Sequence, residues 1–337
     1  MRALAGARPS RGAREQCRVI RGRTAWVPYQ RKRRARVTEA AQRIETIGFV
    51  GVGLMGHGIA TNLLKAGYPL TVIGHRNRAP VEDLVEKGAT EVTSLGDLAA
   101  RSSVVFLCLT DAVAVESVVG EMEASFKPGT VIVDCSTSDP VVTVRLAQKL
   151  AQAGVAYCDS PMGGTPAQAE AGQLQAMVGA TPETFERLKP IFEIWTERAV
   201  LVGGVGDGHR MKLINNFLSL GYGALYSEAL AIARKSGLSV QQFDSVIRGG
   251  RMDCGFYGTF MGYALEGRRD AHKFTLSNAY KDMRYVEAMA NAGGCVSALS
   301  SAIKNSYAMA VTAGGNGPED YVPHLADFVA RANGLTD

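Results

Sequence analysis

The chain of 337 residues is long enough for two domains, and its composition, 46% hydrophobic and 20% charged, is ordinary for a globular protein. No stretch approaches the roughly 18 consecutive apolar residues of a transmembrane helix, which excludes a membrane-spanning protein. The six cysteines lack C-x-x-C spacing and no His and Cys cluster has metal-ligand spacing, so we expect reduced thiols, a cytoplasmic location and no bound metal.

The net charge of +5 is unevenly distributed along the chain. Residues 1–46 hold twelve arginines and one lysine against three glutamates, a net charge of +10, so the remainder carries −5. This basic segment has no apolar periodicity, and we expect it to be disordered. It is similar to an organelle transit peptide, which would place the protein in an organelle matrix. We favour the alternative that this segment is sequence upstream of a true start at Val37. The rest of the chain is mildly acidic, which does not favour nucleic acid as a partner.

The first periodic stretch joins a short apolar run to a glycine-rich turn and an amphipathic helix. Ile47–Val50 predicts a buried parallel strand, and Gly51, Gly53 and Gly56 follow it in G-x-G-x-x-G spacing. Gly51 permits the tight turn, Gly53 lets backbone N–H groups approach a pyrophosphate, and Gly56 lets the helix pack closely. The helix, expected over 54–66, would hold that anion at its N-terminus. The stretch therefore predicts a dinucleotide-binding turn.

A second apolar run, at 70–73, completes a βαβ unit and strengthens that prediction. NAD enzymes usually carry an acid at the end of this strand to bind the ribose hydroxyls, but here His75, Arg76 and Arg78 follow and the first acid along the chain is Glu82. Because a guanidinium binds phosphate in a fork, the two arginines favour NADP over NAD. A solvated polar loop without a ligand is the alternative.

Strands and helices go on alternating to about residue 207, which predicts an α/β fold with a Rossmann-type doubly wound parallel sheet over 47–207. We expect strands at 103–108, 131–133, 156–159, 174–178 and 199–202, and helices at 81–87, 95–100, 140–152 and 182–194. Two of the loops at carboxyl ends of strands carry hydroxyls and free N–H groups that suit a small carboxylate. The first contains Ser136, and the second contains Gly163, Gly164 and Thr165.

The pattern changes after the glycine-rich segment 203–208. From His209 the apolar residues recur at helical spacing to about Ser236, which predicts a long connecting helix. Beyond it, 240–332 indicates helices separated by glycine-rich turns. We therefore expect a second, all-α domain over 208–337.

Lys212 and Asn216 lie four residues apart on the connecting helix, and so on one face of it. A lysine just after a nucleotide domain can take or give the proton of a substrate hydroxyl. A free lysine, with a pKa of about 10.4, is too protonated for this, but burial beside another cation such as Lys281 would bring the pKa toward about 7 to 8. The alternative for Lys212 is an ordinary surface lysine.

Four motifs in order over residues 47 to about 290 carry a family resemblance. They are IGFVGVGLMGHGIATNL, DCSTSDP, GVGDGHRMKLINN and FTLSNAYKDM. Together they resemble the β-hydroxyacid dehydrogenases, the family of 3-hydroxyisobutyrate dehydrogenase and tartronate semialdehyde reductase. The resemblance implies hydride transfer between a nicotinamide cofactor and a small 3-hydroxy acid or semialdehyde, in a homodimer or homotetramer.

The resemblance also implies roles for particular residues. Lys212 would be the catalytic acid and base, Asn216 would orient it or the substrate, and Ser136 would face the substrate carboxylate. The residues implied along the cofactor are Leu54, Met55, Leu109, Thr110, Thr137 and Lys281.

One motif departs from the family pattern. The usual P-V-S-G-G is Pro161–Thr165 here, with the sequence PMGGT. This variant resembles members that reduce longer or sulfonated semialdehydes, such as sulfolactaldehyde reductase or enzymes acting on succinic semialdehyde. Two other classes are disfavoured: a non-catalytic binding module would have lost Lys212, and 6-phosphogluconate dehydrogenase would need a larger helical domain and phosphate-binding residues that this sequence lacks.

Overall fold

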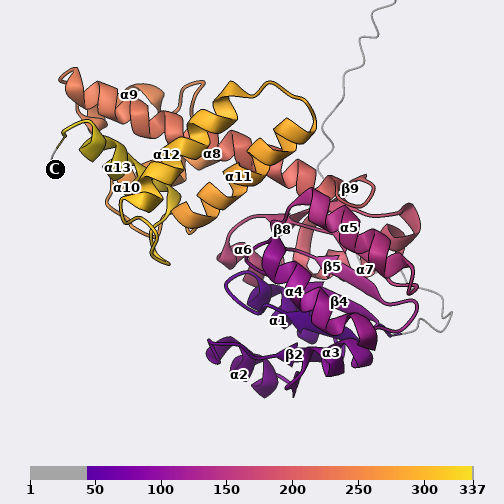
Figure 1. Cartoon of the computed structure of the whole chain (residues 1–337). Coiled ribbons are helices and arrows are strands. Elements are labelled where there is room, and N and C mark those ends of the chain that lie inside the picture. The colour runs from indigo at the N-terminus through magenta and orange to yellow at the C-terminus, as the bar shows by residue number, and fades with distance from the viewer. Residues whose placement is uncertain (1–43, 336–337) are drawn as a thin grey trace, which may run out of the picture. The chain divides into compact units, whose positions relative to one another are not determined.

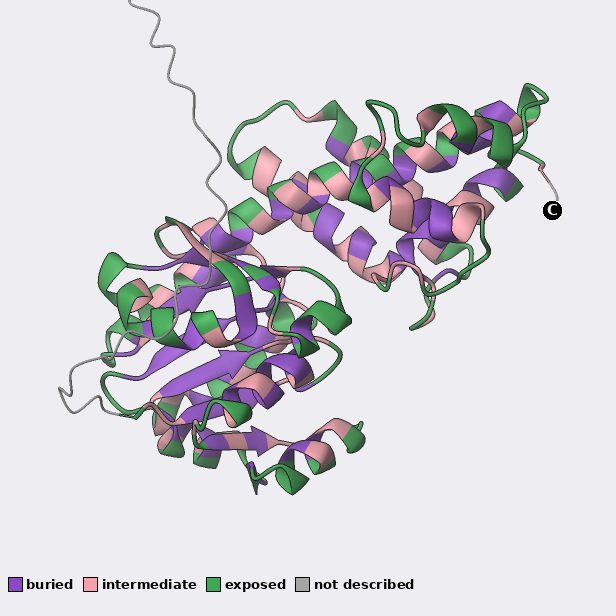
Figure 2. Ribbon diagram, turned by 180° about the vertical axis from the view of Figure 1, so that it is seen from behind, coloured by how far each residue is buried: buried purple, intermediate pink, exposed green. Residues whose placement is uncertain are grey.

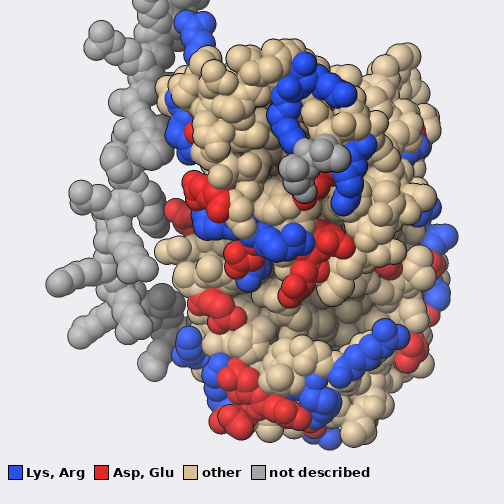
Figure 3. Space-filling model, turned by 90° about the vertical axis from the view of Figure 1, so that its left-hand side faces the viewer, with Lys and Arg blue, Asp and Glu red and all other residues tan. Residues whose placement is uncertain are grey.

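The structure is a computed structural model that describes residues 44–335 (Figure 1). The interpretations given above for the basic segment fall almost entirely outside this range. Within it, no helix is both long enough and apolar enough to cross a membrane. On the face that Figure 3 shows, acidic and basic side chains are intermixed rather than gathered by sign.

One mixed sheet carries all the strands of the described residues. They are β1 (Ile47–Val50), β2 (Leu70–Ile73), β3 (Thr90–Val92), β4 (Val104–Leu107), β5 (Val131–Asp134), β6 (Ala156–Asp159), β7 (Met162–Gly163), β8 (Leu174–Gly179) and β9 (Thr196–Gly203). The order is β3-β2-β1-β4-β5-β6-β8-β7, with β9 beside β8. Strands β1 to β6 pair in parallel, whereas β8 runs antiparallel to β6 and β7. The strand order reverses between β1 and β4, which is where open α/β sheets bind ligands.

Helices cover both faces of this sheet. They are α1 (Gly56–Lys65), α2 (Ala79–Glu86), α3 (Leu95–Arg101), α4 (Ala112–Met122), α5 (Pro140–Ala151), α6 (Pro166–Glu170) and α7 (Pro182–Trp195), with a short 3₁₀ helix at Glu123–Ser125. One buried cluster joins α1, α2, α6 and α7 to the sheet, and a second joins α3, α4 and α5 to its other face. Successive strand residues alternate between the two clusters, as Phe106 and Leu107 do, because side chains of a strand point to opposite faces. The doubly wound α/β prediction is confirmed.

The rest of the described chain is helical. The helices are α8 (Asp207–Lys235), α9 (Val240–Ile247), α10 (Gly255–Ala264), α11 (Leu276–Ala292), α12 (Ala298–Thr312) and α13 (Leu325–Ala332), with a 3₁₀ turn at Val322–His324. A buried cluster formed mainly by α8, α11, α12 and α13 holds them together (Figure 2, purple). Its largest fully buried side chain, Tyr307, donates a hydrogen bond to the carbonyl oxygen of Leu220 on α8 at 2.9 Å. The all-α nature of this part was predicted.

Several elements of residues 44–207 were not predicted from the sequence, and one of them, β7, is a two-residue strand inside the loop expected after β6. Strand β3 has three residues, of which only Val92 is buried, so it gives almost no periodic signal. Helix α4 begins at an Asp111 cap, but apolar residues such as Val113 also lie on its exposed side, so its amphipathic period is weak. Helix α6 has five residues and begins at a capping box between Thr165 and Gln168.

Candidate active site

The glycine-rich turn after β1 has the geometry of a dinucleotide cradle. Gly51 has φ 95°, and a Cβ there would lie 2.2 Å from the carbonyl oxygen of Cys108. A Cβ on Gly56 would lie 2.1 Å from the carbonyl oxygen of Gly51, whereas a Cβ on Gly53 would meet nothing within 4 Å. Among the described residues, Met55, the N-cap residue of α1, makes no side-chain cap hydrogen bond, so the N–H groups at the positive end of that helix have no side-chain cap. These residues fit the diphosphate of a nicotinamide dinucleotide.

The loop after β2 contains an ion pair that sequence reasoning missed. Arg78 donates to both carboxylate oxygens of Glu91, at 2.6 and 2.9 Å, and also lies 3.7 Å from Glu82. Glu91 is on β3, whose pairing with β2 brings the acid to the loop. His75 and Arg76 are exposed, and among the described residues neither makes an ion pair. Of Arg76 and Arg78, therefore, only Arg76 is without an ion pair in the part of the chain that the structure describes.

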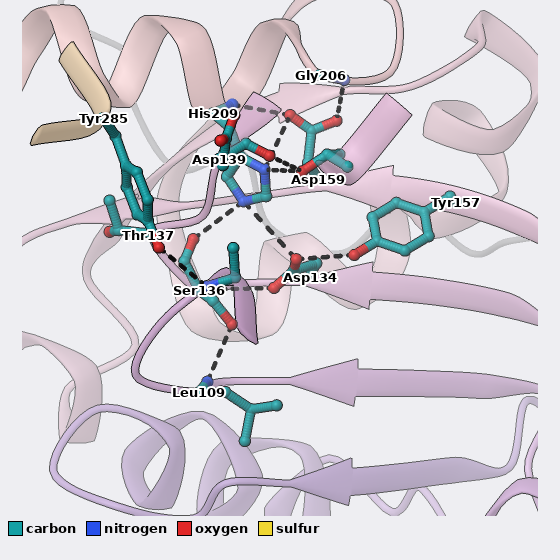
Figure 4. A network of polar contacts seen from close by, with 12 residues as sticks. Leu109, Asp134, Ser136, Thr137, Asp139, Tyr157, Asp159, Gly206, His209 and Tyr285 are labelled. Atoms are coloured by element: carbon teal, nitrogen blue, oxygen red, sulfur yellow. Dashed lines mark hydrogen bonds and ion pairs between the residues drawn. The ribbon is translucent and has the colours of Figure 1, made fainter. Parts of the chain in front are cut away.

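Ser136, directly after β5, is buried and held from three sides (Figure 4). Its backbone N–H donates to Asp134 Oδ1 at 3.0 Å, and its Oγ accepts from the backbone N–H of Leu109 at 3.0 Å. Its carbonyl oxygen lies 3.0 Å from Nε2 of His209, a buried residue near the start of α8. Tyr157 donates to the other oxygen of Asp134 at 2.8 Å, and burial raises the pKa of that phenol. The loop between β5 and α5 is thus fixed by a dense polar network.

Helix α11 presents Lys281 to the loops after β4 and β5. Its Nζ donates to the carbonyl oxygens of Thr110 at 2.6 Å and Thr137 at 3.0 Å. The same Nζ lies 3.2 Å from Oδ1 of Asp282, and one turn along the helix the Tyr285 hydroxyl accepts a hydrogen bond from a backbone N–H of α4. Three residues expected along the cofactor are therefore joined by two hydrogen bonds.

Lys212 lies on α8 close to this group. Burial lowers the pKa of its amine; the Asp282 charge opposes that shift and the Lys281 charge reinforces it. Part of the side chain is exposed, and among the described residues Lys212 makes no hydrogen bond or ion pair. Asn216, buried one turn further on, donates to Asp282 Oδ2 at 2.6 Å. Asp282, which stands beside Lys281 in the quoted motif, is the link that sequence reasoning missed.

His272 is a second residue that the sequence did not single out. It lies between α10 and α11, with Nδ1 3.4 Å from Thr259 Oγ1 and its ring edge-on to Phe256 at 5.1 Å. Burial, reinforced by the positive charge of Lys212, lowers the pKa of His272 to about 4. This imidazole is therefore neutral at neutral pH. A single histidine in the loop between α10 and α11 carries no local sequence signal of a lowered pKa.

The second loop expected to bind substrate is built differently. Gly163 belongs to β7 and pairs with Gln175, and Gly164 has φ 134°. Thr165 Oγ1 caps α6 by accepting from the Gln168 N–H at 3.3 Å. Within residues 44–335, no hydrogen bond joins this loop to Lys212 or Ser136.

Comparisons with known proteins agree with this geometry. Residues 46–204 match the NAD-binding domain of 6-phosphogluconate dehydrogenase, and residues 206–324 match the NAD-binding domain of NADP-dependent 3-hydroxyisobutyrate dehydrogenase. Over 278 residues the chain is 30% identical to 3-sulfolactaldehyde reductase of Escherichia coli (strain K12), covering 82% of this chain and 93% of that protein. The chain belongs to the β-hydroxyacid dehydrogenase family.

This β-hydroxyacid dehydrogenase is also similar to a second curated relative in sequence and to a solved structure in fold. It is 36% identical to 2-hydroxy-3-oxopropionate reductase of E. coli (strain K12) over 211 residues, 60% of this chain and 70% of that protein. The structure of a Mycobacterium tuberculosis 3-hydroxyisobutyrate dehydrogenase with L-serine has the same fold, with a TM-score of 0.75, 24% identity, and coverage of 84% of this chain and 99% of that one. The protein is a nicotinamide-dependent oxidoreductase.

Proposed function

We propose that this β-hydroxyacid dehydrogenase interconverts a small 3-hydroxy acid and its semialdehyde, with Lys212 as general acid and base. The observation that carries the proposal is the amine of Lys212, which has a lowered pKa and no hydrogen-bond partner among the described residues. The bound cofactor supplies or accepts the hydride. In the oxidative direction the neutral amine takes the substrate hydroxyl proton, and in the reductive direction the ammonium returns it to the carbonyl oxygen.

The other residues have positioning or binding roles in this proposal. Asn216, fixed by Asp282, orients Lys212 or the substrate oxygen. The Ser136 hydroxyl accepts from the Leu109 N–H and so keeps its own hydrogen to donate to a substrate carboxylate. The segment of Gly163, Gly164 and Thr165 forms the side of the substrate site opposite Ser136. Its position after β6, at the carboxyl end of a strand, supports this role.

The cofactor site follows the carboxyl edge of the sheet. The residues that would hold it are Gly51, Gly53, Leu54, Met55, Gly56, Leu109, Thr110, Thr137 and Lys281, with His75, Arg76 and Arg78 at the adenosine end. We propose NADP as the preferred cofactor, because Arg76 is an uncommitted guanidinium at the end of β2. Since Arg78 is paired with Glu91, the phosphate contact falls mainly on Arg76.

Two substrate classes remain in the proposal. The similarity to a protein named 2-hydroxy-3-oxopropionate reductase supports a short semialdehyde of the tartronate or isobutyrate type. The PMGGT loop and the similarity to a protein named 3-sulfolactaldehyde reductase support a longer or sulfonated one. A panel of semialdehydes and 3-hydroxy acids, each assayed with NADH and NADPH, tests the function. Absence of turnover with every member of both classes would overturn it.

We also propose that the protein forms a homodimer or homotetramer through α8. One face of this helix carries apolar side chains that are between 41% and 65% exposed, namely Met211, Ile214, Leu218, Tyr222, Leu225 and Ile232. They recur at steps of three, four and seven residues over about 32 Å of helix. Between residues 211 and 232, Glu228 is the only charged residue in the exposed class. A long apolar stripe of this kind suits isologous packing against a second copy.

The proposal extends to the organisation and location of the chain. We place the boundary between the nucleotide domain and the helical domain near residue 207. The matches of residues 46–204 and 206–324 to two different domain families, and the start of α8 at Asp207, support this boundary. Cys108, Cys135 and Cys158 lie near one another at the carboxyl edge of the sheet as free thiols. Free thiols support a reducing compartment, and we propose the cytoplasm.

A further inference from the structure

A buried imidazole lies against the loop that contains Ser136 (Figure 4). Because a carbonyl oxygen can only accept, Nε2 of His209 donates to the Ser136 carbonyl oxygen across 3.0 Å. The other ring nitrogen, Nδ1, is hydrogen-bonded to Thr143 Oγ1 on α5 at 2.8 Å. Carboxylate oxygens of Asp134 and Asp159 lie 3.9 Å from the two ring nitrogens. The ring therefore connects the start of α8 to the loop after β5 and the first turn of α5, which lie 66 to 73 residues earlier in the sequence.

The backbone of His209 is anchored at the same place. Helix α8 has no side-chain cap of its own, because its N-cap residue is Gly206 with φ 94°. Asp159, from the end of β6, replaces that cap: Oδ1 accepts from the Gly206 N–H at 2.6 Å and Oδ2 accepts from the His209 N–H at 2.8 Å. A Cβ at Gly208 would lie 2.4 Å from the carbonyl oxygen of Met177, so the helix start sits as close to the sheet as glycine allows.

His209 precedes Lys212 by three residues on α8, which places the two on neighbouring positions of one helix face. Through its ring, the same residue holds the carbonyl of Ser136. The two groups that the proposed function assigns to the proton and to the substrate carboxylate are thus tied together by one buried side chain. Any movement of the imidazole would move the serine loop relative to the helix that carries the lysine.

We infer that His209 is a positioning residue, which sets the placement of the Ser136 hydroxyl relative to Lys212 through its hydrogen bond to the Ser136 carbonyl oxygen. This inference rests on the proposed function, since that function gives Ser136 and Lys212 the roles whose relative placement His209 would set. His209 itself does not touch the substrate, because it is fully buried under the loop.

Two conservative substitutions separate the two hydrogen bonds of the ring. In His209→Gln the side-chain amide reaches the place of Nε2 and keeps a donor for Ser136, whereas in His209→Asn it reaches only the place of Nδ1 and keeps the Thr143 partner. We expect His209→Asn to raise KM for the hydroxy acid about tenfold, the effect of losing one hydrogen bond, with a smaller change in kcat. We expect His209→Gln to stay close to the wild type. The dissociation constant of the cofactor, measured by fluorescence titration, should not change.

A matched control removes a buried hydrogen bond elsewhere. Tyr307→Phe deletes the bond to Leu220 within the helical core and should lower Tm without changing KM. KM is the deciding quantity because, unlike rate per milligram, it does not depend on the folded fraction. Equal KM values for the His209→Gln and His209→Asn enzymes, whether raised or unchanged, would overturn the inference.

The failure of this inference can be told from failure of the proposed function. If Lys212→Ala retains wild-type turnover, the proposed acid and base is wrong whatever the His209 enzymes do. If Lys212→Ala is inactive and His209→Asn keeps the wild-type KM, only the positioning role of His209 is lost.

Discussion

Arg78, the N-cap residue of α2, and Glu91, on β3, form a two-pronged ion pair with nitrogen to oxygen distances of 2.6 and 2.9 Å. A planar guanidinium matched to both oxygens of a carboxylate is the geometry in which Arg pairs most strongly. The pair matters for cofactor choice because it occupies one of the two arginines that could receive a 2′-phosphate. Selectivity for NADP therefore depends on Arg76.

We predict that Arg76→Ala raises KM for NADPH about tenfold, the cost of one hydrogen bond to a charged group, and leaves KM for NADH almost unchanged. Steady-state kinetics with both cofactors measure this ratio. Arg145→Ala is the control, since Arg145 is an exposed arginine too, but it lies on α5, where it is paired with Glu116. A wild-type enzyme that uses NADH about tenfold better than NADPH would contradict the preference itself.

Glu91→Gln gives a second test of the same loop. The substitution removes the negative charge that holds Arg78 and leaves the side chain nearly the same size. We expect Arg78 to become available to the 2′-phosphate, so KM for NADPH should fall while KM for NADH should not. If KM for NADPH rises instead, the ion pair supports the loop and its loss is structural.

Lys212→Ala should reduce kcat by about 10² to 10⁴-fold, because general acid and base catalysis is lost, while cofactor affinity stays. Lys212→Arg should be equally inactive, since guanidinium does not release a proton at working pH. The control is Lys235→Ala, which removes an exposed lysine from the other end of α8. Activity is measured per folded molecule, with the folded fraction taken from circular dichroism. An active Lys212→Arg enzyme would remove this lysine from the mechanism.

The pH dependence of oxidation should follow the two charges beside Lys212. Oxidation needs the neutral amine, so its rate should rise as pH rises through the lowered pKa of Lys212. In Lys281→Met the loss of a neighbouring positive charge raises that pKa, and the profile should move to higher pH. In Asp282→Asn the loss of a negative charge lowers it, and the profile should move to lower pH. Shifts of both variants in the same direction would contradict this assignment.

Acid stability should depend on His272. Its pKa is lowered from 6.5 to about 4 in the folded protein. Above pH 6.5 the imidazole is neutral in both the folded and the unfolded state. Between pH 6.5 and 4 the unfolded chain binds a proton at this imidazole, whereas the folded protein does not. The free energy of unfolding therefore falls as pH falls through this range. His272→Gln should therefore lose less Tm over this range than the wild type. His75→Gln, at an exposed histidine, should behave as the wild type does.

The apolar stripe of α8 predicts the effect of adding charge to it. The double variant Leu218→Glu, Leu225→Glu should dissociate the oligomer, because pairing two copies would bury uncompensated carboxylates. Light scattering coupled to size exclusion measures the mass directly. Val85→Glu, at an exposed valine of α2, is the control and should keep the wild-type mass. A wild-type protein that is already monomeric at micromolar concentration would overturn the proposal.

The sequence by itself determined the features that depend on short stretches of chain. The strand, turn and helix around Gly51 and Gly56, the long helix that contains Lys212 and Asn216, and the helical nature of the last third follow from apolar period and glycine placement. These signals are local, since periodicity and backbone freedom act over a few residues. Where a segment was short, as in β3, or carried apolar residues on its exposed side too, as in α4, the same signals failed.

Only the tertiary structure decided which distant groups meet. Glu91 reaches Arg78 because β3 pairs with β2, and His209 reaches Ser136 because Asp159 caps α8 against the sheet. Asp282 joins Asn216 because α11 packs on α8. Each contact closes a loop of 13 to 73 residues, and no local pattern specifies its partner. The order of the strands and the packing of the helices determine which residues contact one another, and therefore which charged groups lie near Lys212.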